Sequence, residues 1–174
     1  MKATEVLQDL TGRVRDVVGE IPRGLPTGVI NAHPAGHPNS LVWLLWHTGR
    51  ELDVQLAGLT ANQQVWTSEG YDSSSGVHGA GDSMGFGQSP AQAREVTAAE
   101  VGPVIDYVAA VCDAVDTYLF TLGDADLDAV IDDAWDPPVT RGVRLISILH
   151  DAVIHLGQAA YVLGSDSEGV EDSR

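Results

Sequence analysis

Two histidines and one aspartate stand at positions from which they could bind a metal ion. Asp151 and His155 lie four residues apart in the last strongly apolar segment of the chain, and His47 lies in an earlier one. Residues four apart share a face of a helix, because one turn plus about 40° separates them. Ile148 and Ala159 make this face largely apolar, and a buried carboxylate and imidazole are costly there unless they are paired or bind a metal. Two ligands at this spacing are a known way to build a metal site between helices.

His47 is predicted to point into the same interior. It shares a helical face with Leu44, Glu51 and Val54, and the residues before it are among the most apolar in the chain. Two histidines and one carboxylate, with positions left for water or substrate, are the ligands of catalytic zinc and of non-haem iron centres. We therefore predict a divalent metal held by His47, Asp151 and His155. Glu51, one turn after His47, is predicted to orient the imidazole or to join the coordination. Glu51 or Arg144 is also predicted to orient the ligand or the thiol.

Simpler interpretations of these residues remain open. His47 can be a hydrogen-bonded core histidine, and Asp151 with His155 can be a pair on a helix surface. The other histidines are expected to be structural or exposed: His33 and His37 in a proline-rich loop, His78 in a glycine-rich stretch, and His150 away from the Asp151–His155 face.

Two further residues receive structural rather than chemical interpretations. Cys112 lies among valines without a basic or histidine neighbour, so we expect a small buried hydrophobe rather than a nucleophile. Gly157 costs a helix ~1 kcal/mol relative to alanine. Close packing of another helix is the preferred explanation for this glycine, and approach of a ligand is the alternative.

Four long helices must position these residues. Apolar residues at steps of three and four, together with capping residues, predict helices over residues 3–20, 41–59, 89–122 and 140–163. Asn39 or Ser40 caps the second, Ser89-Pro90 starts the third, and Gly164 ends the last. No strand is predicted.

The prediction is an all-α, antiparallel four-helix bundle over residues 1–164, followed by a disordered acidic tail over residues 165–174. A long connection over residues 60–88 joins the second and third helices. Such a long connection is often functional, and four apolar side chains are expected to anchor it: Trp66, Tyr71, Met84 and Phe86.

Composition excludes some classes of partner. The chain has 9 Lys and Arg against 25 Asp and Glu, a formal charge of -16. A nucleic-acid binder needs a basic surface, and an anionic membrane is disfavoured for the same reason. One cysteine cannot form an internal disulfide, and the N-terminal residues contain no apolar run of signal length. We expect a cytoplasmic protein.

Four segments of the chain resemble the DinB-like superfamily, and within it the actinobacterial branch related to mycothiol-dependent enzymes. They are residues 33–47 (HPAGHPNSLVWLLWH), 85–90 (GFGQSP), 135–140 (WDPPVT) and 155–164 (HLGQAAYVLG). The last segment, together with the upstream helical histidine, is the most specific.

The resemblance implies an up-down-down-up bundle, commonly dimeric, with one metal held by three side chains. The family's histidine ligands fall on His47 and His155. The third ligand is a histidine in much of the family and is Asp151 here, a departure that leaves zinc, nickel, manganese or iron as candidate metals.

Members include enzymes that transfer a low-molecular-weight thiol to an electrophile. A metal can strip the proton from a bound thiol, so the protein would need no nucleophile of its own. A non-catalytic metal-binding or dimeric domain and a metal-assisted hydrolase are the alternatives.

Overall fold

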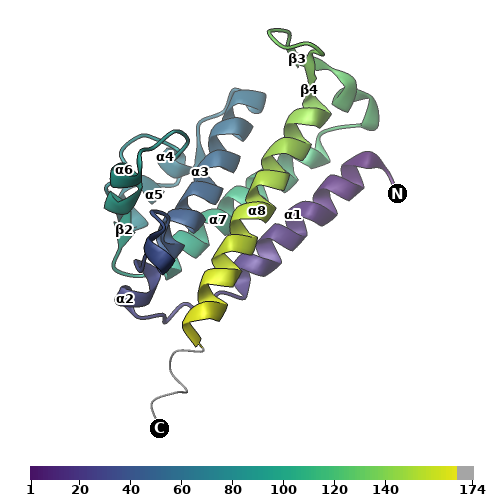
Figure 1. Ribbon diagram of the computed structural model, residues 1–174. Coiled ribbons are helices and arrows are strands. Elements are labelled where there is room, and N and C mark those ends of the chain that lie inside the picture. Colours follow the sequence, from purple (N-terminus) through teal and green to yellow (C-terminus); the bar gives the residue numbers. More distant parts are fainter. Residues whose placement is uncertain (168–174) are drawn as a thin grey trace.

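The computed structural model describes residues 1–167 and is mostly helical, which confirms the all-α prediction in its coarse form. Helix α3 packs on α7 and α8, and α1 packs on the same two helices (Figure 1). The four long helices are α1 (Ala3–Gly19), α3 (Leu41–Thr60), α7 (Gly102–Phe120) and α8 (Arg141–Ser167).

The core lies between these helices and is built mainly from aliphatic side chains. The first turns of α3 are buried on every side, and the Ser40 hydroxyl caps the helix by accepting from the Trp43 N–H, as predicted. The valine stripe of α7 is buried as well, and Cys112 lies within it. Burial raises the pKa of the Cys112 thiol to about 12, so the thiol stays protonated and the prediction of an inert, hydrophobic cysteine is confirmed.

Short elements join the long helices. The helical ones are α2 (Thr27–Ile30), α4 (Val65–Ser68), α5 (Tyr71–Ser74), α6 (Pro90–Glu95) and the 3-10 turns η1 (Pro34–Gly36) and η2 (Asp124–Asp128). Two antiparallel pairs of strands accompany them: β1 (Val77–His78) with β2 (Thr97–Ala98), and β3 (Val130–Asp132) with β4 (Val139–Thr140). The prediction that the chain has no strands is therefore wrong. Ladders of two or three residues are too short to show an alternating pattern in the sequence.

The predicted third helix over residues 89–122 is also wrong, because it is interrupted. Ser89 and Pro90 start a helix as expected, but α6 ends at Glu95 and Val96 is extended. Strand β2 follows, and α7 begins only at Gly102, with Pro103 in its first turn. Proline is favoured at the start of a helix, so Pro103 was the sequence signal for this second start.

The last helix continues beyond its predicted end. Gly164 lies inside α8, which runs to Ser167, since a glycine within a helix costs only ~1 kcal/mol. The predicted disordered tail over residues 165–174 falls mostly on residues 168–174, which lie outside the described residues. Within residues 1–167, α8 is long and apolar enough to cross a membrane over Arg141–Gly164, with a mean hydropathy of 1.3. One such helix is weak evidence for a membrane, and α8 packs on α1 and α3.

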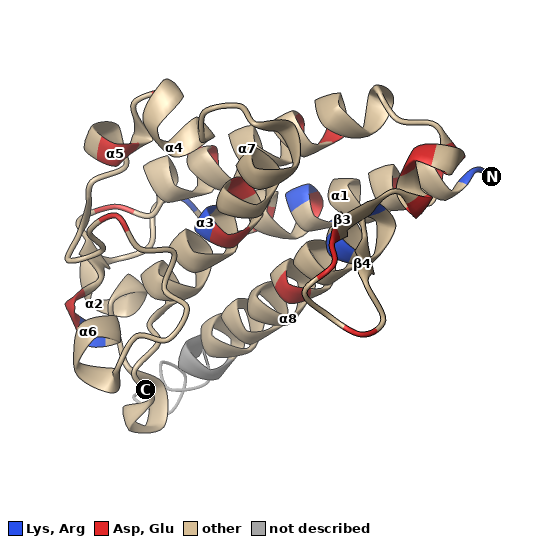
Figure 2. Cartoon of the chain, turned by 90° about the horizontal axis from the view of Figure 1, so that it is seen from above, with Lys and Arg blue, Asp and Glu red and all other residues tan. Residues whose placement is uncertain are grey.

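The acidic residues are spread over helices and loops (Figure 2). Several of the scarce arginines hold elements together: Arg15 pairs with Asp113 and Asp116, both at 2.7 Å, and Arg23 pairs with Asp106 at 2.6 Å. These pairs tie α1 and the residues after it to α7.

Candidate metal centre

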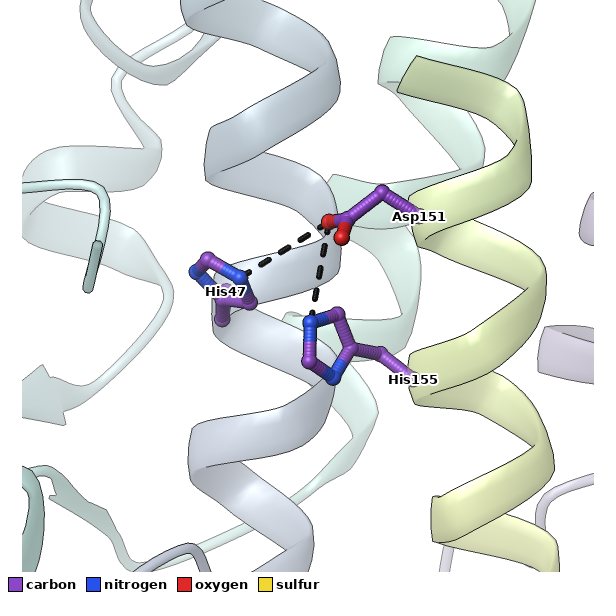
Figure 3. A group of neighbouring side chains, drawn as sticks. All are labelled: His47, Asp151 and His155. Atoms are coloured by element: carbon purple, nitrogen blue, oxygen red, sulfur yellow. Dashed lines mark ion pairs between the residues drawn. The ribbon is translucent and has the colours of Figure 1, made fainter. Parts of the chain in front are cut away.

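The structure brings His47, Asp151 and His155 together between α3 and α8. His47 lies in α3, and Asp151 and His155 project from successive turns of α8 toward it (Figure 3). One ligand atom from each residue lies within 4.8 Å of the other two. The face shared by residues four apart on α8 is therefore the face that meets α3, as the sequence predicted.

The Asp151 carboxylate stands between the two imidazoles without a hydrogen bond to either. Its Oδ2 atom is 3.8 Å from His47 Nε2 and 3.6 Å from His155 Nε2 (Figure 3). Both distances exceed the ~3.2 Å limit of an ordinary N–H···O bond. The centroids of the two imidazole rings are 4.6 Å apart, with an angle of 83° between their planes.

Hydrogen bonds on the far side of each ring fix where its proton lies. His47 Nδ1 lies 2.5 Å from the Met84 carbonyl oxygen, and His155 Nδ1 lies 3.0 Å from Gln158 Oε1. Since these oxygens only accept, each Nδ1 carries the proton and each Nε2 keeps its lone pair. Both Nε2 atoms therefore lie in the cluster around Asp151. In metal sites, an oxygen that accepts from the other ring nitrogen orients a histidine ligand in the same way.

Burial keeps His47 neutral. Only 5% of the residue is exposed, and desolvation lowers the pKa of its imidazole below 6.5. The bond to Met84 and the charge of Asp151 act in the opposite direction, but the burial effect is larger. The Trp43 indole stacks on the ring at a centroid distance of 4.6 Å, which fixes the ring plane. Neutral imidazole is the form that binds a metal.

A cleft of about 380 Å³ opens onto the three residues. Its walls include Asn39, Trp43 and the turn from Gly85 to Gln88. Gly85 has a φ of +96°, and a Cβ atom there would lie 2.8 Å from His47 Nδ1 and 3.0 Å from the Trp46 ring. Only glycine lets this backbone approach the imidazole so closely.

Comparisons with known proteins assign the family. The DinB superfamily profile matches residues 10–159, a range that contains His47, Asp151 and His155. The chain belongs to the DinB superfamily. No curated protein matches it.

Among solved structures, the DinB chain is similar to a conserved protein from Enterococcus faecalis. The two sequences are 34% identical, the similarity covers 93% of this chain and 95% of that one, and the TM-score is 0.83. The fold of this DinB protein thus has an experimental counterpart over nearly its whole length.

The geometry of the cluster fits a divalent ion. Two ligand atoms on one tetrahedral zinc lie about 3.4 Å apart when each bond is about 2.1 Å long. The two nitrogen–oxygen separations are 3.6 and 3.8 Å. The donor set of two imidazoles and one carboxylate suits zinc, nickel, manganese or iron, and the partly exposed carboxylate side of the cluster leaves room for further ligands.

Glu51 lies near Asp151, and Gln55 links it to Arg144, which also pairs with Asp132 at 3.5 Å. The Gln55 amide donates to Glu51 Oε1 at 3.3 Å and accepts from Arg144 Nη1 at 2.7 Å. Burial, followed by the charge of Asp151, raises the pKa of Glu51. The charge of Asp151 therefore acts on Glu51, whereas the hydrogen bond of Glu51 is to Gln55 and not to an imidazole. The role of these two residues in orienting ligands stays a prediction.

The remaining histidines lie elsewhere. His78 is exposed, as expected, whereas His150, expected to be structural or to support the ligands, is exposed as well. His37 is exposed too, and its Nδ1 accepts from the Asn39 N–H, which sets up the entry into α3. Gly157 is exposed, and a Cβ there would meet no atom within 4 Å. Close helix packing within the chain is therefore not the reason for this glycine, and that prediction is wrong.

Sequence reasoning missed the residues that support the imidazoles. The Met84 carbonyl carries no side-chain signal, and Gln158 lies in the most specific segment of the resemblance but was given no role. Gly85 lies in the 85–90 segment that resembles the family, but the resemblance gave this glycine no role. Its φ of +96° and its close approach to His47 show its role, which is to let the backbone lie against the imidazole.

Proposed function

We propose that this chain binds one divalent metal ion through His47, Asp151 and His155 and uses it to transfer a low-molecular-weight thiol to an electrophile. One observation carries the proposal. The Nε2 atoms of His47 and His155 lie beside the Asp151 carboxylate, which has no hydrogen bond to either ring, and all three residues line an open cleft. Membership of a superfamily that often binds metal supports it. Zinc or nickel suits the donor set best.

The described side chains favour a reaction that needs no protein nucleophile. Cys112 is fully buried in the core and keeps its proton. A divalent cation, when bound, lowers the pKa of a thiol bound to it. Met84 and Gln158 then hold the imidazoles in place, and Trp43 keeps water from one face of His47. The thiol proton would pass to water, which reaches the site on the partly exposed side of Asp151.

The test compares two histidines of α8. His155→Ala removes a proposed ligand, whereas His150→Ala removes an exposed histidine from the same helix. We expect the wild-type protein to bind one equivalent of zinc or nickel by titration calorimetry and elemental analysis. The His155 variant should lose at least ~100-fold in affinity, more than the loss of a supporting partner causes, and the His150 variant should match the wild type.

Activity separates the candidate reactions. The metal-loaded wild type should consume mycothiol in the presence of an electrophile such as monochlorobimane, and His155→Ala should abolish this. Turnover of an ester without any thiol would favour a hydrolase, and metal binding without turnover would favour a binding domain. A wild-type protein that binds no divalent metal would overturn the proposal.

We also propose that the protein is a cytoplasmic homodimer with the up-down-down-up helix order of its family. The packing of α1 and α3 each against α7 and α8 supports this order. Support for a dimer comes from the outer face of α8, where four apolar side chains are exposed: Val143, Ile146, Val153 and Ile154. Such a patch on one helix is typical of an interaction surface. Sedimentation of the purified protein measures the oligomeric state.

A further inference from the structure

Phe86 exposes a large aromatic side chain at the cleft that holds the candidate metal centre. The residue is 84% exposed and lines the same cleft as His47, Asp151 and His155. Burying a phenyl ring stabilises a protein or a complex, because apolar surface is removed from water. The sequence predicted that Phe86 anchors its loop on the helices, and its exposure shows that prediction to be wrong.

Hydrogen bonds hold the chain on both sides of Phe86, so the exposure of the Phe86 side chain is a fixed feature of the turn. The Gln88 N–H donates to the Gly85 carbonyl at 3.2 Å. The Gln88 side chain accepts from Trp43 Nε1 at 2.8 Å and donates to Ser83 Oγ at 3.2 Å. On the other side of Phe86, the Met84 carbonyl accepts from His47. Hydrogen bonds thus tie the turn to α3 before and after Phe86, and the phenyl ring does not pack in the core.

Two glycines set the direction of this turn. Gly85 and Gly87 have φ values of +96° and +75°. Both lie in the left-handed region that side-chain-bearing residues rarely adopt, so Phe86 stands between two positions that favour glycine. A turn that served only to connect β1 with α6 would need neither the close approach to His47 nor an aromatic residue at its tip.

The lining of the cleft combines polar and apolar side chains. Besides the two histidines and Asp151, the cleft is lined by the apolar side chains of Trp43, Phe86 and Pro90. A volume of about 380 Å³ lies in the range of small-molecule sites, ~300–1,000 Å³. This combination suits a small ligand that has a polar, metal-binding head and an apolar body.

We infer that Phe86 is a specificity-determining residue that packs on the apolar or aromatic body of a small substrate whose polar head lies at the metal centre. The inference rests on the proposed function, since the polar head needs the metal. It assigns the substrate class as small, apolar electrophiles or thiol conjugates, and it places the Gly85–Gln88 turn in the recognition of that class.

The experiment uses the metal-loaded protein and two hydroxamates that share a metal-binding head. Benzohydroxamate carries an aromatic body and acetohydroxamate carries a methyl group. By titration calorimetry, we expect the wild type to bind benzohydroxamate at least ~10-fold more tightly. Phe86→Ala should weaken benzohydroxamate roughly 5- to 10-fold, the range of one aromatic contact, and leave acetohydroxamate unchanged. Phe86→Trp should keep the preference.

A matched control replaces another exposed phenylalanine. Phe120→Ala removes a side chain that is 78% exposed at the end of α7, and it should change neither affinity. Equal affinities of the wild type for the two hydroxamates, or an unchanged preference in Phe86→Ala, would overturn the inference alone. A metal-loaded wild type that binds neither hydroxamate would overturn the proposed function, and the substrate class with it.

Discussion

Two polar clusters lie within two turns of each other on α3, and they are built in opposite ways. The first joins Arg50 and Asp53 to Tyr107 of α7, and all three residues are at most 3% exposed. The Asp53 carboxylate accepts from the N–H groups of Val65 and Trp66, both at 2.8 Å, and from the Tyr107 hydroxyl at 2.9 Å. The second cluster is His47, Asp151 and His155, in which the carboxylate has no hydrogen bond within the described residues.

The difference distinguishes a polar cluster that stabilises the fold from one that awaits a ligand. The Asp53 carboxylate has three of its about four acceptor positions filled within the chain, and its burial keeps a ligand from the rest. Asp151, with 39% of its side chain exposed, and the two Nε2 atoms beside it have kept their lone pairs. Hydrogen-bond satisfaction, rather than residue type, therefore separates the two clusters, since both contain a carboxylate beside basic side chains.

The closed cluster also supports the open one. Arg50 donates from Nε to the Ser83 carbonyl at 3.3 Å and from Nη2 to the Asp82 carbonyl at 3.4 Å. These two carbonyls directly precede Met84, whose own carbonyl accepts from His47. The buried guanidinium thus holds the segment that fixes the His47 proton on Nδ1.

The largest effect is expected where the closed cluster is broken. Asp53→Asn places an amide N–H₂ among donors and leaves the buried charge of Arg50 without its partner, which lies 3.8 Å away. We expect a loss of about 3–5 kcal/mol in the free energy of unfolding, measured by urea denaturation. Asp9→Asn is the control, because Asp9 forms an exposed pair with Arg13, a kind of pair worth about 0–1 kcal/mol. A loss below about 1 kcal/mol for Asp53→Asn would contradict the structural role of the cluster.

The same substitution in the open cluster, Asp151→Asn, should change stability little and metal affinity strongly. Asp151 accepts no hydrogen bond from either imidazole, so Asp151→Asn should change the free energy of unfolding of the metal-free protein by less than about 1 kcal/mol. Affinity for zinc should fall by at least ~10-fold, because the amide carries no charge and is a poor zinc ligand. Urea denaturation and metal titration of the two Asn variants, side by side, measure this contrast. Equal losses of stability would show that the clusters do not differ.

The sequence predicted the elements whose signals are local. Ser40, Ser89 and Pro90 start helices where expected, because capping residues act within one turn. The spacing of Asp151 and His155 was enough to place both on one face of α8, since helix geometry fixes that relation. His47 was placed with them by residue type and by the family resemblance, because helical periodicity gives no distance between two helices.

The rest depended on contacts that no local pattern encodes. The break between α6 and α7 accompanies a two-residue pairing of β1 with β2. The anchoring of residues 60–88 depends on Asp53, whose carboxylate reaches backbone N–H groups of α4. In the sequence, Asp53 looked like one more acidic residue of a highly charged chain. Its burial became visible only when α3, α4 and α7 were seen packed together.

The smallest effect concerns Glu51, which lies between the two clusters on α3. Burial and the charge of Asp151 raise its pKa above 4.5, so the native state binds the proton more tightly than the unfolded state does. Stability of the wild type should therefore fall as the pH rises from about 4.5 through the raised pKa, and the penalty remains at higher pH.

Glu51→Gln removes this penalty and keeps an oxygen that accepts from Gln55. The variant should be more stable than the wild type at pH 8, by less than about 1 kcal/mol because the group is half-exposed, and equally stable at pH 4. The lowered pKa of His47 is common to both proteins and cancels in the difference, so urea denaturation at the two pH values isolates Glu51. A variant that is less stable than the wild type at pH 8 would show that ionised Glu51 supports the fold, and that the charge of Asp151 does not reach it.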